Sequence, residues 1–368
     1  MTSPAVRPVA VLFGGTSAEA EVSVVSGTAI AAALASRGIA VRQVLVRRDG
    51  SLAMLPAGHL RGERSPREYT QGAPAALGAE PIALDALLGE LRRDGGVAVP
   101  ALHGPGDEDG ALQVALAAHG IPFVGADHAA ARLGMEKPRF KALAASLGLP
   151  VLPHLVVDAA EWHRDREASM ARVAAFAATA TDDGALIGKP TAHGSSIGMR
   201  IARGAGEWGA AVDLALEFGD AALLEPYLER PRELEVALLE YPSGDVAAFG
   251  PGEVFSGRDF YDYEAKYAPG VSRTTVSPSI EGSLQAALHG AAQALFAASG
   301  CRGLARIDFL VAQRGSRAGA WFVSEINTFP GFTPISLYPA LVEAAGIPFA
   351  DLCELLVETA AARQAGGA

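Results

Sequence analysis

The chain has 368 residues, of which 50% are hydrophobic and 19% are charged. A chain of this length is too long to fold around one hydrophobic core, so we expect two or three packed units. The composition excludes a disordered or fibrous chain. The formal net charge of −11 argues against nucleic acid or an anionic membrane as the main partner.

The cysteines and the start of the chain indicate the compartment. Cys301 and Cys353 lie in apolar stretches without a second cysteine or a histidine at metal-ligand spacing, so we expect buried thiols in a reducing compartment. The apolar run 9–13 is too short for a signal peptide, and no stretch reaches the roughly 20 apolar residues of a membrane span. The sequence therefore predicts a cytoplasmic protein.

Short apolar strands alternate with helical stretches in the first part of the chain. Strands are predicted at residues 9–13, 41–47, 97–102 and 122–124, and a helix at 23–37. This alternation predicts an α/β domain with a mostly parallel sheet over residues 1–125. Residues 49–79 are rich in Gly, Pro, Arg and Ser, so we expect them to be the least ordered part of the chain.

Two further units are expected after residue 125. Alanine-rich helical stretches and a strand at 185–189 form the second, residues 126–222. The third unit, residues 223–368, contains a predicted helix at 283–299, strands at 304–311 and 321–326, and a closing helix. Leu352, Leu355 and Leu356 recur at helical spacing in this closing helix, so we expect it to pack by one face.

Four polar residues on two of these strands indicate a site. Residues two apart in a strand share a face, so Arg306 projects with Asp308, and Glu325 projects with Asn327. If the strands pair as a hairpin across the turn at 313–319, these oxygens converge into a site suited to Mg²⁺ carrying nucleotide phosphates. Arg306 beside it could stabilise developing negative charge. The alternative is a solvated strand face, but the apolar neighbours and the absence of lysine favour a site.

A second signal is Lys189, which ends a strand shortly before the small-residue run 194–198. Small residues let backbone N–H groups approach a phosphate closely, and the lysine supplies charge. Most Gly/Ser turns are only turns, so this motif is weak by itself. It is not the P-loop pattern, and the glycines at 14–15 do not form a GxGxxG fingerprint, which removes the best evidence for a Rossmann oxidoreductase.

The most distinctive segment is FYDYEAKY at residues 260–267. Further motifs are LFGGTSAE at 12–19, LHGP at 102–105, EDG at 108–110, MEK at 135–137 and NTFPGFT at 327–333. In this order and composition the chain resembles the D-alanine–D-alanine ligase family, and 260–267 matches that family's mobile loop. The resemblance implies an ATP-grasp fold, in which a Rossmann-like N-terminal α/β domain precedes two α+β subdomains that clasp ATP.

The resemblance also implies the nucleotide and metal site. The implied magnesium ligands are Asp308, Glu325 and Asn327, holding two Mg²⁺ ions that Mn²⁺ can replace. The lysines that match phosphate contacts are Lys137, Lys189 and Lys266, with the small-residue loop at Ser195 and Ser196. The residues that match the adenine hinge are Glu225, Pro226, Tyr227 and Leu228, and Glu233 matches the acid that binds the ribose.

The amino-acid sites follow from the same resemblance. Glu19 matches the acid that holds the first substrate's ammonium, linked by hydrogen bonds to Ser195 and Tyr267. His103 lies near the second substrate, whose carboxylate Ser336 and Leu337 would receive. Arg306 and the Gly331 N–H would stabilise the tetrahedral intermediate. Outside these motifs Glu19 would more often be a helix N-terminal acid, His103 a turn histidine and Tyr267 a packing aromatic.

The activity implied is ATP-dependent ligation of two D-alanines through an acyl-phosphate for peptidoglycan precursor synthesis, by a homodimer. Alternatives are a ligase for another D-amino acid pair or a specialised-metabolite dipeptide, and, in a different class, a non-catalytic nucleotide-binding regulator. Five positions depart from the family pattern: Asp107, Val114, Gly188, His193 and Pro231. They leave the loop geometry around His103, and with it the second substrate, open.

Overall fold

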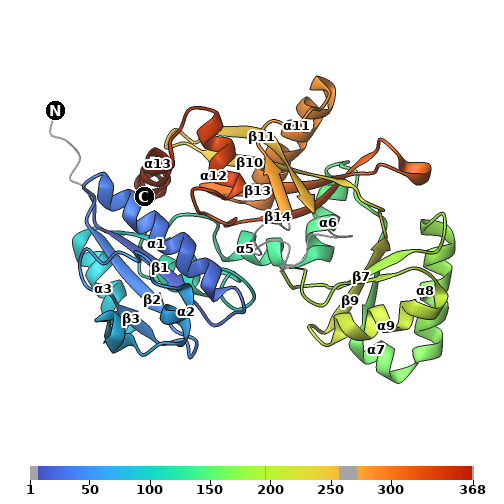
Figure 1. Ribbon diagram of the computed structural model, residues 1–368, viewed down its shortest axis with the longest axis horizontal. Coiled ribbons are helices and arrows are strands. Elements are labelled where there is room, and N and C mark those ends of the chain that lie inside the picture. Colours follow the sequence, from blue (N-terminus) through green and yellow to red (C-terminus); the bar gives the residue numbers. More distant parts are fainter. Residues whose placement is uncertain (1–6, 195, 257–271, 367–368) are drawn as a thin grey trace.

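The structure is a computed structural model that describes residues 7–194, 196–256 and 272–366. Three β-sheets are arranged along the molecule, and the C-terminal sheet lies between the N-terminal and central sheets in Figure 1. No helix within these described ranges is long and apolar enough to cross a membrane.

The N-terminal sheet has the strand order β4-β3-β2-β1-β5. Its strands are β1 (Val9–Gly14), β2 (Val41–Val46), β3 (Leu52–Met54), β4 (Glu80–Ile82) and β5 (Val97–Pro100). Its helices are α1 (Ala20–Ser36), α2 (Pro66–Gln71), α3 (Leu84–Asp94) and α4 (Ala111–Ala118), with the 3₁₀ turn η1 (Pro74–Leu77). Alternate β1 residues enter two separate apolar cores, so both faces of this strand are covered.

The predicted α/β character of this part is confirmed, with differences in detail. The β1–β2 and β1–β5 pairs are parallel, whereas β3 runs in the opposite direction and makes antiparallel pairs with β2 and β4 at one edge. The expected strand at 122–124 is reduced to a single bridge between Ala98 and Phe123. Helix α1 begins at Ala20, three residues before the predicted start at 23.

Residues 49–79 were expected to be poorly ordered, and this prediction is wrong. The segment contains β3, α2 and η1. Helix α2 starts with a capping box, in which Ser65 N–H donates to the Glu68 carboxylate at 2.8 Å. Tyr69 is 2% exposed and packs edge-on against Phe13, with ring centroids 6.4 Å apart. A helix cap and one buried aromatic ring order a segment whose composition suggests a loop.

The central sheet has the order β6-β9-β7-β8 and is antiparallel throughout. Its strands are β6 (Leu155–Asp158), β7 (Leu186–Pro190), β8 (Arg200–Ala202) and β9 (Ala221–Pro226). Its helices are α7 (Ala159–Arg164), α8 (Arg166–Ala180) and α9 (Ala205–Leu216). Gly188 lies against α9, where a Cβ would come 2.9 Å from the Ala211 carbonyl oxygen. This close approach explains why the strand carries glycine before Lys189.

The C-terminal sheet has the order β12-β11-β10-β13-β14. Its strands are β10 (Arg232–Glu240), β11 (Val246–Ser256), β12 (Ser272–Thr275), β13 (Leu304–Val311) and β14 (Trp321–Asn327). The later helices are α11 (Gly282–Ser299), α12 (Leu337–Ala344) and α13 (Phe349–Gly366), with the 3₁₀ turn η2 (Gly315–Arg317). Two earlier helices, α5 (His128–Met135) and α6 (Lys137–Ser146), also pack on this sheet. The domain boundaries near 125 and 222 stay predictions.

The closing helix α13 packs against α1 and β5 of the N-terminal unit. Leu352 and Leu356 are buried in that core and Leu355 is half-buried, so the prediction of a one-faced helix is confirmed. Cys301 and Cys353 are buried free thiols, as expected, and burial raises the pKa of Cys301 to about 11. Because the two ends of the chain share a core, the loop before α12 is held against the N-terminal sheet.

Candidate active site

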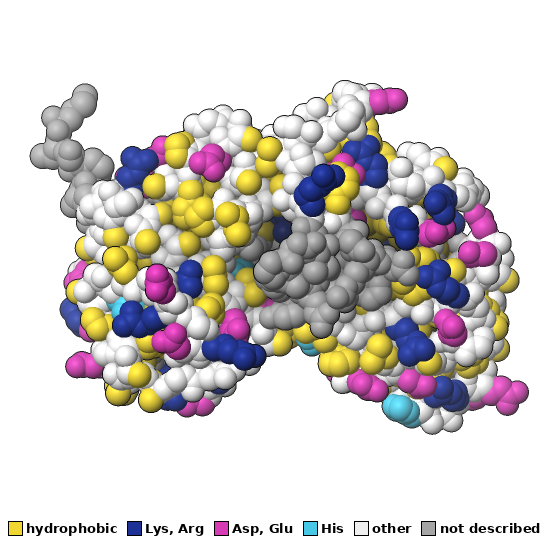
Figure 2. Space-filling model, in the orientation of Figure 1, with side chains coloured by type: hydrophobic (Ala, Val, Ile, Leu, Met, Phe, Trp, Pro, Cys, Tyr) yellow, Lys and Arg dark blue, Asp and Glu magenta, His cyan; other side chains and the backbone are white. Residues whose placement is uncertain are grey.

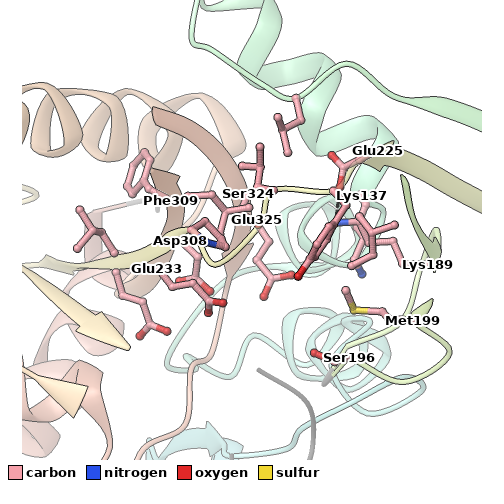
Figure 3. A pocket seen from close by; sticks show the side chains of 18 of the residues that line it. Lys137, Lys189, Ser196, Met199, Glu225, Glu233, Asp308, Phe309, Ser324 and Glu325 are labelled. Carbon is pink, nitrogen blue, oxygen red and sulfur yellow. Dashed lines mark ion pairs between the residues drawn. The ribbon is translucent and has the colours of Figure 1, made fainter. Parts of the chain in front are cut away.

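A cleft lies between the central and C-terminal sheets (Figure 3). It is open to solvent and is lined by both charged and apolar side chains. The predicted site residues that line it are Lys137, Lys189, Ser196, Glu225, Pro226, Tyr227, Leu228, Glu233, Arg306, Asp308 and Glu325. The structure thus brings together predicted nucleotide and metal residues that lie as far apart in the sequence as Lys137 and Glu325, whereas Asn327 is not part of the lining.

The polar hairpin forms as predicted. Strands β13 and β14 pair antiparallel, with Asp308 opposite Glu325 and Arg306 opposite Asn327. The buried Ile307 and its partner on β14 face the core on the other side. The register shifts after Asp308, which adds one residue to β14 and places Ser324 in the cleft lining. Figure 3 shows Asp308 and Glu325 close together in the cleft.

Arg306 lies among carboxylates. Its guanidinium donates two hydrogen bonds of 2.7 Å to Asp308, and it lies 3.0 Å from a Glu235 carboxylate oxygen. Burial lowers the pKa of Arg306, but Asp308, Glu235 and Glu325 outweigh it and raise this pKa well above its usual value. The arginine is therefore a permanent cation in the wall of the cleft.

The carboxylates of this hairpin suit a divalent cation. Asp308 and Glu325 present oxygen ligands from neighbouring strands, and such hard donors are what Mg²⁺ prefers. Asn327 donates its amide N–H to Asp308 at 3.0 Å, so its amide would have to turn to offer oxygen to a metal. No cluster of three His, Cys, Asp or Glu forms a metal site among the described residues, so phosphate and water oxygens would complete the shell. The assignment of these ligands stays a prediction.

Glu225 forms the inner end of the cleft. Its carboxylate is 2% exposed and makes ion pairs with Lys189 of β7 and Lys141 of α6. Burial raises the pKa of Glu225, but the two lysines outweigh it and lower this pKa to about 2. Lys189, expected on a phosphate, thus pairs with Glu225 in this structure, and Figure 3 shows the two residues with Lys137 on one side of the cleft. Lys141 was missed by the sequence analysis.

The small-residue run closes the cleft on the central side. Lys137 donates its ammonium to the His193 carbonyl oxygen, which ties this run to α6. The His193 ring lies edge-on to Phe218, with centroids 5.8 Å apart. Ser196 has φ 57°, a left-handed backbone conformation that is uncommon outside glycine. Of the predicted site residues, Ser195, Lys266 and Tyr267 lie outside the described residues.

Glu19 lies beside both the N-terminal loop and the small-residue run. It directly precedes α1 and is 8% exposed. A Cβ on Gly104 would come 2.8 Å from a Glu19 carboxylate oxygen, and one on Gly194 would come 3.6 Å from the same oxygen. The carboxylate therefore lies between two segments, and at Gly104 a side chain would collide with it. This place fits an acid that holds a substrate ammonium.

His103 is connected to the C-terminal loop through Ser26. The histidine is 5% exposed, and its Nε2 lies 3.3 Å from the Ser26 hydroxyl oxygen. Phe332 N–H donates to the same hydroxyl at 3.3 Å, and the ring of Phe329 lies 6.0 Å from the imidazole. The sequence analysis missed Ser26, and a polar residue on the buried face of α1 was the only signal available.

The loop before α12 folds back on itself. Ser336 is the N-cap of α12, and its hydroxyl lies 2.8 Å from the Thr333 hydroxyl. A Cβ on Gly331 would come 3.5 Å from the same Ser336 oxygen, and Leu337 is 8% exposed. Gly331, Ser336 and the start of α12 are thus grouped, and a helix N-terminus favours a carboxylate.

Asp107, which stands where the family usually has glycine, joins two loops of this site. Its carboxylate accepts backbone N–H groups of Thr16 and Ser17, both at 2.8 Å. The Ser17 hydroxyl in turn accepts Glu19 N–H at 3.1 Å and donates to the His103 carbonyl oxygen. Burial raises the pKa of Asp107. Asp107 therefore links its own loop to the loop that carries Glu19.

The comparisons with known proteins agree with the motifs. Family models described as D-ala D-ala ligase N-terminus and C-terminus match residues 8–126 and 143–358. A D-alanine–D-alanine ligase of Methylobacterium sp. (strain 4-46) is 35% identical, over 98% of this chain and 92% of its own. The solved structure of the D-alanine–D-alanine ligase of Coxiella burnetii has a TM-score of 0.76 at 27% sequence identity, and the match covers 98% of this chain and 97% of that one. VanG D-Ala:D-Ser ligase of Enterococcus faecalis has a TM-score of 0.78 at 25% sequence identity, and the match covers 96% of this chain and 99% of that one.

These likenesses extend over nearly the whole chain, so they concern the complete arrangement of sheets and not one motif. The mixed α/β architecture with three sheets matches that of the solved ligases, and the ATP-grasp fold implied by the motifs is confirmed. The chain belongs to the D-alanine–D-alanine ligase family.

Proposed function

We propose that this chain joins two D-alanines into D-alanyl-D-alanine with ATP, through an acyl-phosphate, for peptidoglycan precursor synthesis. The observation that carries the proposal is the cleft, in which the hairpin of Arg306, Asp308 and Glu325 faces Lys137 and Lys189. Family membership over nearly the full chain supports it.

The nucleotide would lie along this cleft. Glu225 to Leu228 would hold the adenine and Glu233 the ribose, while Lys137 and Lys189, with Lys266, would meet the phosphates. Asp308, Glu325 and Asn327 would hold two Mg²⁺ ions, replaceable by Mn²⁺, which would neutralise phosphate charge when bound. Positioning and charge neutralisation are what phosphoryl transfer chiefly requires.

Activation is necessary because a carboxylate does not react with an amine at neutral pH. The γ-phosphoryl group passes from ATP to the carboxylate of the first D-alanine, giving ADP and an acyl-phosphate. Glu19 would hold the ammonium of this substrate. The amine of the second D-alanine then attacks the acyl carbon, the amide bond forms, and inorganic phosphate leaves. Arg306 and the Gly331 N–H would stabilise the negative oxygen of the tetrahedral intermediate.

The identity of the second substrate needs its own argument, because one similar structure is named a D-Ala:D-Ser ligase. Ser336 and Leu337 at the start of α12, with His103 nearby, would receive its carboxylate. We expect D-alanyl-D-alanine as the main product when D-alanine is supplied together with D-serine or D-lactate at equal concentration. Mass spectrometry resolves the three products. A larger yield of either mixed product would assign the chain to that ligation instead.

A non-catalytic nucleotide-binding regulator is the alternative from another class. The paired carboxylates, Arg306 and the lysines facing them in the cleft argue against it, because the residues proposed for catalysis are all retained. We also propose a cytoplasmic homodimer with D-alanine and ATP as its ligands. Figure 2 shows basic and acidic side chains interspersed over this face of the described residues, a distribution that suits small-molecule substrates better than a polyanion.

Asp107→Gly should raise the KM for the first D-alanine by about tenfold, because it removes a charged acceptor of two backbone N–H groups from the loop that carries Glu19. Asp107→Asn keeps one acceptor oxygen and should have a smaller effect. Initial rates over a wide range of D-alanine concentration separate the KM of the first D-alanine from the KM of the second. Equal KM values for wild type and Asp107→Gly would show that Asp107 does not position the first substrate.

A further inference from the structure

Lys141 is a deeply buried cation beside the cleft. Its side chain is 3% exposed, and its ammonium pairs with one carboxylate oxygen of Glu225 while Lys189 pairs with the other. Glu225 and Lys189 line the cleft, whereas Lys141 lies behind them and does not reach it. Two lysines therefore share one buried carboxylate, and only one of them faces the place of a ligand.

The use of lysine in this chain is unusually restricted. Of the thirty basic side chains that are lysine or arginine, only four are lysines: Lys137, Lys141, Lys189 and Lys266. Three of these match phosphate contacts of the family, and the fourth is Lys141. Everywhere else the chain uses arginine. The compact ammonium of Lys141 can pair with one oxygen of Glu225. An arginine here would present a planar guanidinium that can bind both oxygens of Glu225 and so compete with Lys189.

The position of Lys141 on α6 supports a link to the nucleotide. Lys137 and Lys141 are four residues apart, so they lie on the same face of the helix. Lys137 reaches the cleft from the first turn, and Lys141 reaches Glu225 from the second. One helix face therefore serves both the phosphate end of the cleft and its inner end.

We infer, on the basis of the proposed ATP-dependent function, that Lys141 is a positioning residue for the nucleotide site, which keeps Glu225 paired when Lys189 turns from that carboxylate to a nucleotide phosphate. Withdrawing the only partner of a buried carboxylate is strongly unfavourable. With two lysines present, one can leave while the other remains. Without a nucleotide, the group formed by Lys141, Lys189 and Glu225 carries one excess positive charge, which also favours the binding of a phosphate.

Lys141→Met tests this role, because methionine keeps the length of the side chain and removes its charge. Lys189 then becomes the sole partner of Glu225 and is held away from the phosphate. We expect the dissociation constant of ATP, measured by calorimetry without D-alanine, to rise about tenfold or more. The KM for D-alanine should change less than about twofold. The melting temperature should not fall, because a neutral Glu225–Lys189 pair remains.

Arg363→Met is the matched control. Arg363 is a partner of Glu240, another largely buried carboxylate, and neither residue lines the cleft. This variant should lower the melting temperature and leave ATP affinity unchanged. A Glu225→Gln background is the second control, because Lys141→Met should change ATP affinity little once the carboxylate is gone.

Unchanged ATP affinity in a folded Lys141→Met protein would overturn the inference. So would an equal loss of affinity in the wild-type and Glu225→Gln backgrounds, since Lys141 would then not act through Glu225. Because ATP binding is measured without D-alanine, the outcome does not depend on ligation. A wild type that binds ATP but makes no dipeptide would refute the proposed function and leave this test intact.

Discussion

Asp308→Asn and Glu325→Gln should each lower Mg²⁺-dependent ADP release by on the order of a thousandfold while the fold is retained. Each change removes a formal charge at nearly constant volume from the pair that stands opposite across β13 and β14. The proposed metal site loses a carboxylate ligand, and the transferring phosphoryl group loses the neutralisation that depends on it. A coupled assay of ADP release, with circular dichroism of each variant, measures both expectations.

Glu253→Gln provides a control in the same sheet. Glu253 is a buried carboxylate that pairs with Arg232 at 2.7 Å and does not line the cleft. Its loss should weaken stability and leave the Mg²⁺ dependence of the rate unchanged. Rates near wild type in Asp308→Asn or Glu325→Gln would show that these two strands present a solvated face and hold no metal.

Arg306→Met should destabilise the fold by about 3–5 kcal/mol and reduce kcat by on the order of a thousandfold. The loss of stability is expected because Asp308 and Glu235 would be left close together without their shared cation. The loss of rate is expected because Arg306 would stabilise the tetrahedral intermediate. Thermal denaturation and steady-state kinetics measure the two effects separately.

Arg306→Lys distinguishes charge from geometry. A lysine keeps the cation but lacks the planar fork that donates two bonds to Asp308. It should therefore recover most of the stability and little of the rate. If Arg306→Lys recovered both in full, charge alone would suffice and a directed role for the guanidinium would be wrong.

The hairpin was the most predictable part of the site, because its geometry is local. A period of two in each strand determines which side chains share a face, and the short turn at 313–319 leaves antiparallel pairing as the simple solution. Asp308, Glu325 and Arg306 could therefore be placed together from the sequence. The closing helix was predictable for the same reason, since its apolar spacing has the period of a helix.

Contacts between distant segments could not be predicted in this way. The ion pairs of Lys141 and Lys189 with Glu225 join α6, β7 and β9, and no local pattern marks Lys141 as different from an exposed helix lysine. Ser26 joins α1 to loops near residues 103 and 332. Such tertiary contacts depend on how the units pack. At residues 49–79 the composition predicted little order, but the segment forms β3, α2 and η1.

The central claim is tested most directly by incubating the purified chain with ATP, Mg²⁺ and D-alanine and measuring ADP and dipeptide in the same sample. We predict D-alanyl-D-alanine and ADP in equal amounts, and neither product when L-alanine replaces D-alanine or when Mg²⁺ is chelated. Binding of ATP without ADP release in the presence of D-alanine, or ADP release without a dipeptide, would contradict the account.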